Sequence, residues 1–315
     1  VPLRPARQYS HPMYRQIARN KRWSILLIAL FCLAVIALGL FASWVFAEPW
    51  PLVLLVIACP LYVWQALSHA TKSAAETAGV RFVSLEEERR LHRIVETTAI
   101  RAGIPMPRIG VIDEDAPNAF AASLKPGDAV LAVTRGALEL LDDSELEAVI
   151  AHEVAHIVNQ DGRVTLTAFA LVGSIVSLAA ALLMLGWAMI RSVIPEFKFG
   201  LGLINGAIGL LLLLLGAAAG IVGFLVGPLI TSAVSRRREF LADASGVELT
   251  RFPDGLVRAL TKIEERGGML ARPVPEVAEL FIVDPTGPSW FDRLLRSHPP
   301  TSERVERLEA MAREF

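Results

Sequence analysis

The sequence predicts a mainly α-helical integral membrane protein with about four transmembrane helices and a separate α+β part that contains a small β-sheet. Composition gives the first indication, because 53% of the 315 residues are hydrophobic and the mean hydropathy is +0.48. The second is that the apolar residues gather in long stretches without charges, and the third is a run of short strand-like segments between two of these stretches. Together these observations indicate a chain that alternates between membrane hairpins and mixed segments.

Four stretches contain no Asp, Glu, Lys or Arg and are long enough to cross a bilayer. About 20 apolar residues in a helix span a hydrocarbon core of roughly 30 Å, whereas apolar runs of about 10–14 residues are typical of soluble helices. A cleaved signal peptide is not expected for the first stretch, which is too long and has no small-residue cleavage site. The four stretches are Trp23–Ala47, Pro49–Ser68, Val164–Ile190 and Phe199–Ser235.

Basic residues predict the orientation of these spans. Six of them precede the first span, namely Arg4, Arg7, Arg15, Arg19, Lys21 and Arg22, and Arg236–Arg238 follow the fourth. Because Lys and Arg favour the cytoplasmic side, we expect both termini and the middle segment there, with two tight turns outside. Topology and anionic lipid explain these clusters, so the expected partner is the lipid bilayer and not nucleic acid.

The spans divide the chain into five parts. We predict a cytoplasmic tail (1–22), a first transmembrane hairpin (23–68), a cytoplasmic half-domain (69–163), a second hairpin (164–231) and a second cytoplasmic half-domain (232–315). Cys32 and Cys59 lie in predicted spans without CxxC spacing, so they predict packing and no disulfide framework.

The first half-domain shows helix and strand signals in turn. Ser84 and Glu87 have capping-box spacing before a helix that we expect to end near Gly103. Three strands are expected at 108–113, 118–123 and 128–133, separated by turn residues. A second helix begins with Asp143 or Ser144 as its N-cap, and either continues into the third span or breaks near residues 161–162. Helices are also predicted around 236–249 and 301–315.

The chemistry of the chain centres on the sequence HEVAH in that second helix. His152 and His156 are four residues apart, so both imidazoles lie on one helix face and can bind the same ion. Glu153 lies to the side, where it can take a proton from metal-bound water. Zinc accepts such ligands and tolerates an open position. The alternative, an ordinary charged helix, is disfavoured by the cap and by the apolar flanks.

A hydrolytic zinc site needs a third protein ligand. Glu239 and Asp243 are four residues apart, so Glu239 can bind the ion while Asp243 accepts a hydrogen bond from a ligand histidine. Taken alone, this acidic pair is best interpreted as two solvated carboxylates that balance the charge of the three arginines before it. Because the HEVAH site lacks a third ligand, the interpretation of Glu239 as that ligand is favoured.

The motif HEVAH, followed some 80 residues later by SRRREFLADA beyond a hydrophobic hairpin, resembles the HtpX-type membrane zinc metalloproteases. These are relatives of the CAAX prenyl endopeptidases and belong to the gluzincins, which have a zincin-like catalytic domain. The resemblance extends from the first span to about residue 310. It implies one Zn²⁺ per chain bound by His152, His156 and Glu239, with Glu153 as the base and Asp243 beside a ligand histidine.

Two further matches to the family are shorter. The run NAFAA resembles the family's strand at the edge of the cleft, which implies that Asn118, Ala119, Phe120 and Ala121 bind substrate backbone. The sequence SHPPTSER resembles the family's His-Pro element, which implies that His298 and Arg304 donate to the oxyanion of the reaction. Ala122–Ser123 stand where the family has Thr-Gly, so the shape of this strand differs from the pattern.

The resemblance implies a zinc-dependent endopeptidase in the bacterial cytoplasmic (inner) membrane with its catalytic domain in the cytoplasm. Its expected substrates are misfolded or unassembled membrane proteins, cleaved in quality control or the stress response. One alternative is a processing protease for a single lipidated or signalling substrate. Another is a zinc-stabilised sensor or scaffold that does not cut, although a structural zinc site needs no carboxylate like Glu153. A metal transporter is disfavoured because the spans lack Asp, Glu and His in their charge-free cores.

Overall fold

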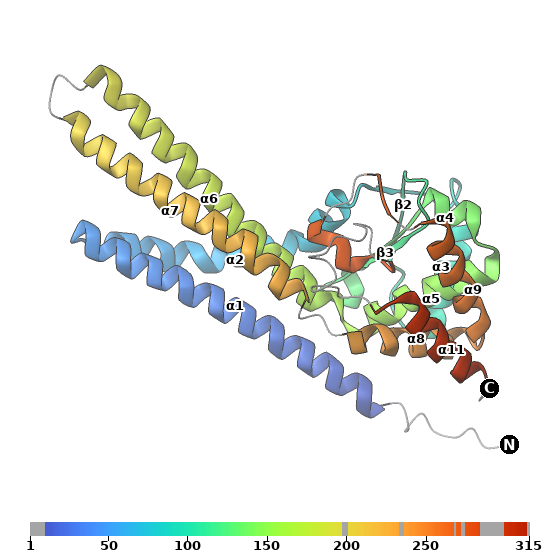
Figure 1. Cartoon of the computed structure of the whole chain (residues 1–315). Helices are drawn as coiled ribbons and strands as arrows, with labels where there is room; N and C mark the ends of the chain where they lie inside the picture. The colour runs from blue at the N-terminus through green and yellow to red at the C-terminus, as the bar shows by residue number, and fades with distance from the viewer. Residues whose placement is uncertain are drawn as a thin grey trace.

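Four long helices extend together from one side of the part that contains the sheet and the shorter helices (Figure 1). The computed structural model describes residues 10–196, 201–232, 236–267, 269–271, 275–283 and 299–313. The long helices form two hairpins, and Figure 1 shows all four lying side by side. They are α1 (Ser10–Phe46), α2 (Trp50–Thr77), α6 (Gly162–Glu196) and α7 (Leu201–Ser232).

Three of these helices are long and apolar enough to cross a membrane. The candidate spans are Ile17–Ala37, Leu52–Thr77 and Gly162–Arg191. In α7, the described side chains give a shorter apolar stretch, Gly206–Ile221. The prediction of transmembrane helices is therefore confirmed, whereas the fourth span remains a prediction.

Small residues let α6 and α7 approach closely. A Cβ placed on Gly186 would lie 2.7 Å from the carbonyl oxygen of Gly209, and one on Gly209 would lie 2.9 Å from that of Gly186. Such contacts between small residues are typical of helix pairs in lipid, where association depends on close packing. The second hairpin is thus a tightly packed unit.

The sheet has four strands in the order β1-β2-β4-β3. The predicted strands are present as β2 (Arg108–Ile112), β3 (Ala119–Ala122) and β4 (Val130–Thr134). Strands β2 and β4 are parallel, and β3 runs antiparallel to β4 at one edge. The other edge is β1 (Val80–Phe82), a three-residue strand antiparallel to β2 that the sequence analysis missed because so short a run shows no clear alternation.

Helix α5 (Asp143–Asn159) lies at the centre of the apolar core beside the sheet, with many of its side chains fully buried. Its N-cap is Asp142, so both predicted caps, Asp143 and Ser144, are wrong. Asp142 accepts from the backbone N–H groups of Ser144 and Glu145, while the Glu145 side chain accepts from the N–H of Asp142. The remaining helices are α3 (Arg89–Ala102), α4 (Arg135–Leu140), α8 (Arg236–Thr250), α9 (Pro253–Arg266), α11 (Thr301–Ala312) and the 3₁₀ helices η1 (Pro126–Asp128) and η3 (Pro275–Leu280).

Helix α5 breaks before the third long helix, so of the two alternatives the break is correct. Gln160 adopts a left-handed conformation with φ of +54°, and α6 begins two residues later at Gly162. A Cβ on Gly162 would lie 2.9 Å from the carbonyl oxygen of Ser123, directly after β3. We call residues 159–162 the α5–α6 joint. It connects the sheet, α5 and the membrane hairpin at one point.

Candidate active site

Helix α5 presents both histidines of the HEVAH motif on one face. The Nε2 atoms of His152 and His156 lie 3.1 Å apart, and the two rings are nearly perpendicular, at 86°. His152 is completely buried, whereas the side chain of His156 is 17% exposed. The four-residue spacing therefore brings two imidazole nitrogens to one point, as predicted.

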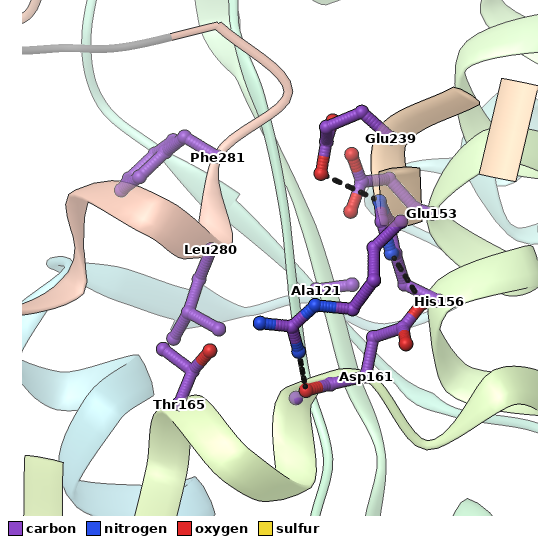
Figure 2. A pocket seen from close by; sticks show the side chains of 10 residues that line it. Ala121, Glu153, His156, Asp161, Thr165, Glu239, Leu280 and Phe281 are labelled. Carbon is purple, nitrogen blue, oxygen red and sulfur yellow. Dashed lines mark hydrogen bonds and ion pairs between the residues drawn. The ribbon is translucent and has the colours of Figure 1, made fainter. Parts of the chain in front are cut away.

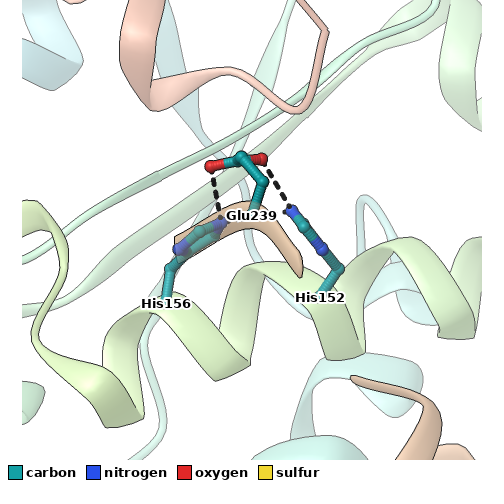
Figure 3. Close-up of side chains that lie close together, drawn as sticks. All are labelled: His152, His156 and Glu239. Atoms are coloured by element: carbon teal, nitrogen blue, oxygen red, sulfur yellow. Dashed lines mark hydrogen bonds and ion pairs between the residues drawn. The ribbon is translucent and has the colours of Figure 1, made fainter. Parts of the chain in front are cut away.

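Helix α8 brings Glu239 to the same point (Figure 3). Its Oε2 lies 3.7 Å from Nε2 of His152, and its Oε1 lies 3.6 Å from Nε2 of His156. One ligand atom from each of these three residues falls within 4.8 Å of the others. Residues 156 and 239, which are separated by α6 and α7 in the sequence, thus meet in space as the sequence predicted.

A glycine allows α8 to approach α5 closely enough for this meeting. A Cβ on Gly246 would lie 3.0 Å from the backbone nitrogen of His152 and 3.2 Å from its Cα. These are backbone atoms, which cannot rotate away as a side chain can. Gly246 therefore fixes the spacing of the two helices that carry the three residues.

We call the residues behind His152 the inner flank of the site: Asp243 and Arg304. Nδ1 of His152 lies 2.9 Å from Oδ1 of Asp243, the contact that the spacing of the acidic pair predicted. Arg304, which is buried, donates from Nε and Nη2 to the two oxygens of Asp243 at 3.0 and 2.7 Å. Its Nη1 donates to the carbonyl oxygen of Ile282 at 2.9 Å. The inner flank is a buried histidine–carboxylate–guanidinium chain.

The second histidine has its own carboxylate, which the sequence analysis missed. Nδ1 of His156 lies 3.0 Å from Oδ2 of Asp161, and Asp161 is 5% exposed. The signal was present, because an acidic residue five positions after the motif, where α5 ends, is within reach of the ring nitrogen that faces away from the ion. We call Asp161, together with Asn20 and Arg238, which donate to it, the outer flank.

Glu153 lies beside the group of three, on the wall of a pocket (Figure 2). It is 2% exposed, and among the described residues its Oε1 has no hydrogen-bond partner. Residues of β3, α5, the α5–α6 joint, the start of α6, α8 and the end of η3 line this pocket. They are Ala121, Glu153, His156, Asp161, Gly162, Thr165, Arg238, Glu239, Leu280 and Phe281. A buried carboxylate oxygen of this kind has room for a reacting water or a proton.

The donor set fits a divalent cation. Ligand atoms at about 2.0–2.2 Å from a tetrahedral zinc ion lie roughly 3.3 Å apart, close to the observed separations of 3.1, 3.6 and 3.7 Å. Two imidazole nitrogens that face each other at 3.1 Å need a proton or a cation between them. The carboxylate of Glu239, which faces both nitrogens, would stabilise a cation there. Each histidine also has a carboxylate at its other nitrogen, as metal-binding histidines usually do.

Burial and charge shift the titration of the site when no cation is bound. Burial lowers the pKa of His152 to about 4, assisted by the charge of Arg304, and burial raises the pKa of Glu153 to about 8. Burial also opposes protonation of His156, but Glu239 and Asp161 outweigh it and raise its pKa to about 9. The metal-free site therefore holds protons that a bound cation would displace.

Of the residues expected at the substrate edge, Ala119–Ala121 lie on β3 and Asn118 directly precedes it; the edge of β3 away from β4 is the one concerned. Asn118 donates from Nδ2 to the carbonyl oxygen of Val283 at 2.9 Å, and Ile282 N–H donates to the carbonyl oxygen of Ala119. Phe120 forms a bridge with Phe281. Of the four predicted residues, Ala121 lines the pocket. Backbone groups of residues two apart in a strand point to the same side. Those of Ala121 therefore point away from β4, as those of Ala119 do.

Of the two predicted oxyanion donors, the structure describes Arg304. His298 lies outside the described residues. Arg304 is placed behind His152, with its nearest contact to Glu239 at 3.9 Å. It donates to Asp243 and to the Ile282 carbonyl, and its Nη2 lies 3.4 Å from both ring nitrogens of His152. This arrangement favours a role in holding the inner flank.

Two histidines and a glutamate around one point, with an adjacent buried glutamate and membrane-spanning helices, are the features of a membrane metallopeptidase. The sequence pattern described as Peptidase family M48 matches residues 85–312. Proteins named "Protease HtpX homolog" from Streptococcus thermophilus and Tropheryma whipplei are each 37% identical, over 95% and 96% of this chain and 100% of their own lengths. The chain belongs to peptidase family M48, and the predicted resemblance to HtpX-type proteases is confirmed.

A solved structure is also similar. Ste24p from S. mikatae aligns with 93% of this chain and 66% of its own, with a TM-score of 0.45 and 19% identity.

Proposed function

We propose that this chain is a zinc-dependent endopeptidase that cleaves peptide bonds of membrane or membrane-associated proteins at the cytoplasmic face. The observation that carries the proposal is the convergence of His152, His156 and Glu239 within 4.8 Å beside the buried carboxylate of Glu153. Membership of family M48 supports peptide hydrolysis, and the charge distribution around the spans supports a cytoplasmic site.

Each residue of the site has a proposed part in the reaction. His152, His156 and Glu239 would hold one Zn²⁺, which supplies a Lewis acid and lowers the pKa of a bound water. Glu153 takes the proton of the attacking water and passes it to the leaving amine, and its lack of a described partner at Oε1 leaves that atom available for this transfer. Asp243 orients the His152 ring, and Arg304 holds Asp243.

The edge of β3 is the proposed place for the substrate backbone. An extended peptide that adds beside Ala121 would lie in the pocket wall next to Glu153, because Ala121 and Glu153 line the same pocket. Main-chain hydrogen bonds do not read the substrate's sequence, which suits substrates that are recognised by being unfolded. Residues 281–283 pair with the neighbouring part of this edge, so Asn118, Ala119 and Phe120 would shape the edge beside the substrate, and His298 would donate to the oxyanion.

The proposed cellular role is quality control of misfolded or unassembled membrane proteins in the bacterial cytoplasmic membrane. The site lies where the long helices meet the sheet (Figure 1), so it would meet loops and tails of proteins in the same bilayer. The names of the relatives at 37% identity support a protease.

The proposal is tested by comparing the purified parent with Glu153→Gln. Both should retain about one zinc per chain, and the variant should cleave an unfolded casein-like substrate at least about 100-fold more slowly, as expected when a general base is lost. Glu147→Gln is the matched control, because it makes the same change at a partly exposed position of α5 that pairs with Arg101, and it should cleave like the parent. Glu239→Ala should lose both zinc and activity.

The same experiment separates the alternatives. Equal cleavage by the parent and Glu153→Gln would overturn the mechanism. Zinc binding without any cleavage by the parent would favour a zinc-stabilised sensor or scaffold. Cleavage of one lipidated or signalling peptide but of no unfolded protein would favour a dedicated processing protease.

A further inference from the structure

The outer flank of the site reaches the first membrane helix. Asn20 lies near the start of the candidate span in α1 and is 3% exposed. Its Nδ2 donates to Oδ1 of Asp161 at 3.0 Å, while Oδ2 of Asp161 lies 3.0 Å from Nδ1 of His156. Residues 141 positions apart in the sequence are thus joined through one carboxylate to a proposed zinc ligand.

A second buried side chain fixes the same residue from α8. Nη1 of Arg238 donates to the backbone carbonyl of Asp161 at 2.9 Å, and Arg238 is 4% exposed. It directly precedes the proposed ligand Glu239. The aspartate is therefore held by its side chain from α1 and by its backbone from α8, so small displacements of either helix act on the carboxylate that faces His156.

From this geometry we propose that Asn20 and Asp161 are positioning residues that orient the His156 ring, so that the docking of α1 at the α5–α6 joint sets the zinc affinity. The inference rests on the proposed function, since it takes His156 as a zinc ligand. The carboxylate favours an N–H on Nδ1 and leaves Nε2 free to bind the ion, which is the usual arrangement behind a metal-binding histidine.

A purely structural role for Asn20 is the competing explanation. The same Nδ2 lies 3.4 Å from the carbonyl oxygens of Asn159 and Gln160, where it could simply cap the end of α5. A cap would affect the stability of the helix end but not the zinc affinity. The contact to Asp161 is the shortest of the three, which favours the positioning role.

The test is a zinc competition titration on the detergent-solubilised full chain with a chromophoric chelator. Asp161→Ala should raise the Kd for zinc about 10- to 100-fold, the usual cost of losing such a partner, and Asp161→Asn should recover part of it. Asn20→Ala should raise the Kd about two- to tenfold and should have no further effect in the Asp161→Ala background, because it acts through that carboxylate. The visible spectrum of the cobalt-substituted protein should change in both single variants.

Ser24→Ala is the matched control. Ser24 is 2% exposed, lies one turn further along α1, and its Oγ has no hydrogen-bond partner in the part of the chain that the structure describes. This variant should bind zinc like the parent. That result would show that a small change in the buried face of α1 does not by itself alter the zinc affinity.

Two outcomes overturn the inference: a parental zinc Kd for Asn20→Ala, or full additivity of Asn20→Ala and Asp161→Ala. His156→Ala distinguishes this failure from failure of the proposed function. If His156→Ala loses zinc while the two flank variants keep the parental Kd, only the positioning role is wrong. If His156→Ala binds zinc like the parent, the proposed metal site itself is wrong.

Discussion

The two histidines of the site are held in different ways. His152 is fully buried, and its inner flank consists of side chains from α8 and α11 within the domain that contains the sheet. His156 lines the pocket, and its outer flank begins at the α5–α6 joint and includes a residue of membrane helix α1. One of the two proposed zinc ligands is thus positioned by the domain core and the other by the junction with the membrane helices.

The charges on the two flanks differ as well. On the inner flank, Asp243 faces a buried guanidinium, and although burial opposes its ionisation, Arg304 and His152 lower its pKa. On the outer flank, Asp161 accepts from the neutral amide of Asn20 and faces His156, which is 17% exposed and has Glu239 as a second carboxylate neighbour. Removal of one member of a fully buried ion pair costs much, whereas loss of a neutral hydrogen bond, or of one of two carboxylates beside a partly exposed imidazole, costs less. The inner flank should therefore contribute mainly to the free energy of unfolding, and the outer flank mainly to metal affinity.

The largest expected effect distinguishes the flanks by stability. Asp243→Ala leaves Arg304 buried without its main partner, so the free energy of unfolding should fall by about 3–5 kcal/mol. Asp161→Ala should cost about 1–2 kcal/mol, because the partner it leaves behind, His156, is 17% exposed and keeps Glu239 as a second carboxylate neighbour. Denaturant unfolding of the metal-free variants measures both. Equal losses would remove the distinction.

A smaller effect is expected when the inner flank is displaced without any change in charge. The Cβ of Gly246→Ala would press on backbone atoms of His152, so the unfolding free energy should fall by roughly 1–3 kcal/mol. Zinc affinity should fall too, because α8 carries Glu239. Gly173→Ala in α6 is the matched control, since its Cβ would meet nothing within 4 Å. If both alanine variants bind zinc alike, the close approach of α8 to α5 is not needed.

The most gradual expected effect is a pH dependence of the stability, which arises from His156 and Glu153. The raised pKa values of His156 (about 9) and Glu153 (about 8) mean that the folded metal-free protein keeps protons which the unfolded chain releases above its own values of 6.5 and 4.5. Between pH 6.5 and 8 the metal-free protein should therefore lose stability as pH rises, by about 1 kcal/mol per pH unit for each such proton. Zinc displaces these protons, so the increase in Tm that zinc produces should grow over this range.

Thermal unfolding with and without zinc, at one free zinc concentration, measures this change. A zinc-dependent increase in Tm that stays constant from pH 6.5 to 8 would contradict it.

Features set by local spacing could be predicted from the sequence. The i, i+4 relation brought His152 and His156 together and likewise Glu239 and Asp243, and the long charge-free stretches indicated the membrane helices. Helix α9 and strand β1 were missed, because one follows directly on the α8 pattern and the other is three residues long. The link from Asn20 to Asp161 could not be predicted, since it depends on how α1 docks against a joint 141 residues away.

The separation of the proposed zinc ligands along the chain has a consequence for synthesis. Glu239 follows His156 by 83 residues (239 − 156), most of them in α6 and α7. At a translation rate of roughly 5–20 residues per second, Glu239 leaves the ribosome about 4–17 s after His156. During that interval the nascent chain carries only two of the three residues that converge in the folded protein. The order of the residues thus delays assembly of the hydrolytic centre until both helices of the second hairpin have been translated.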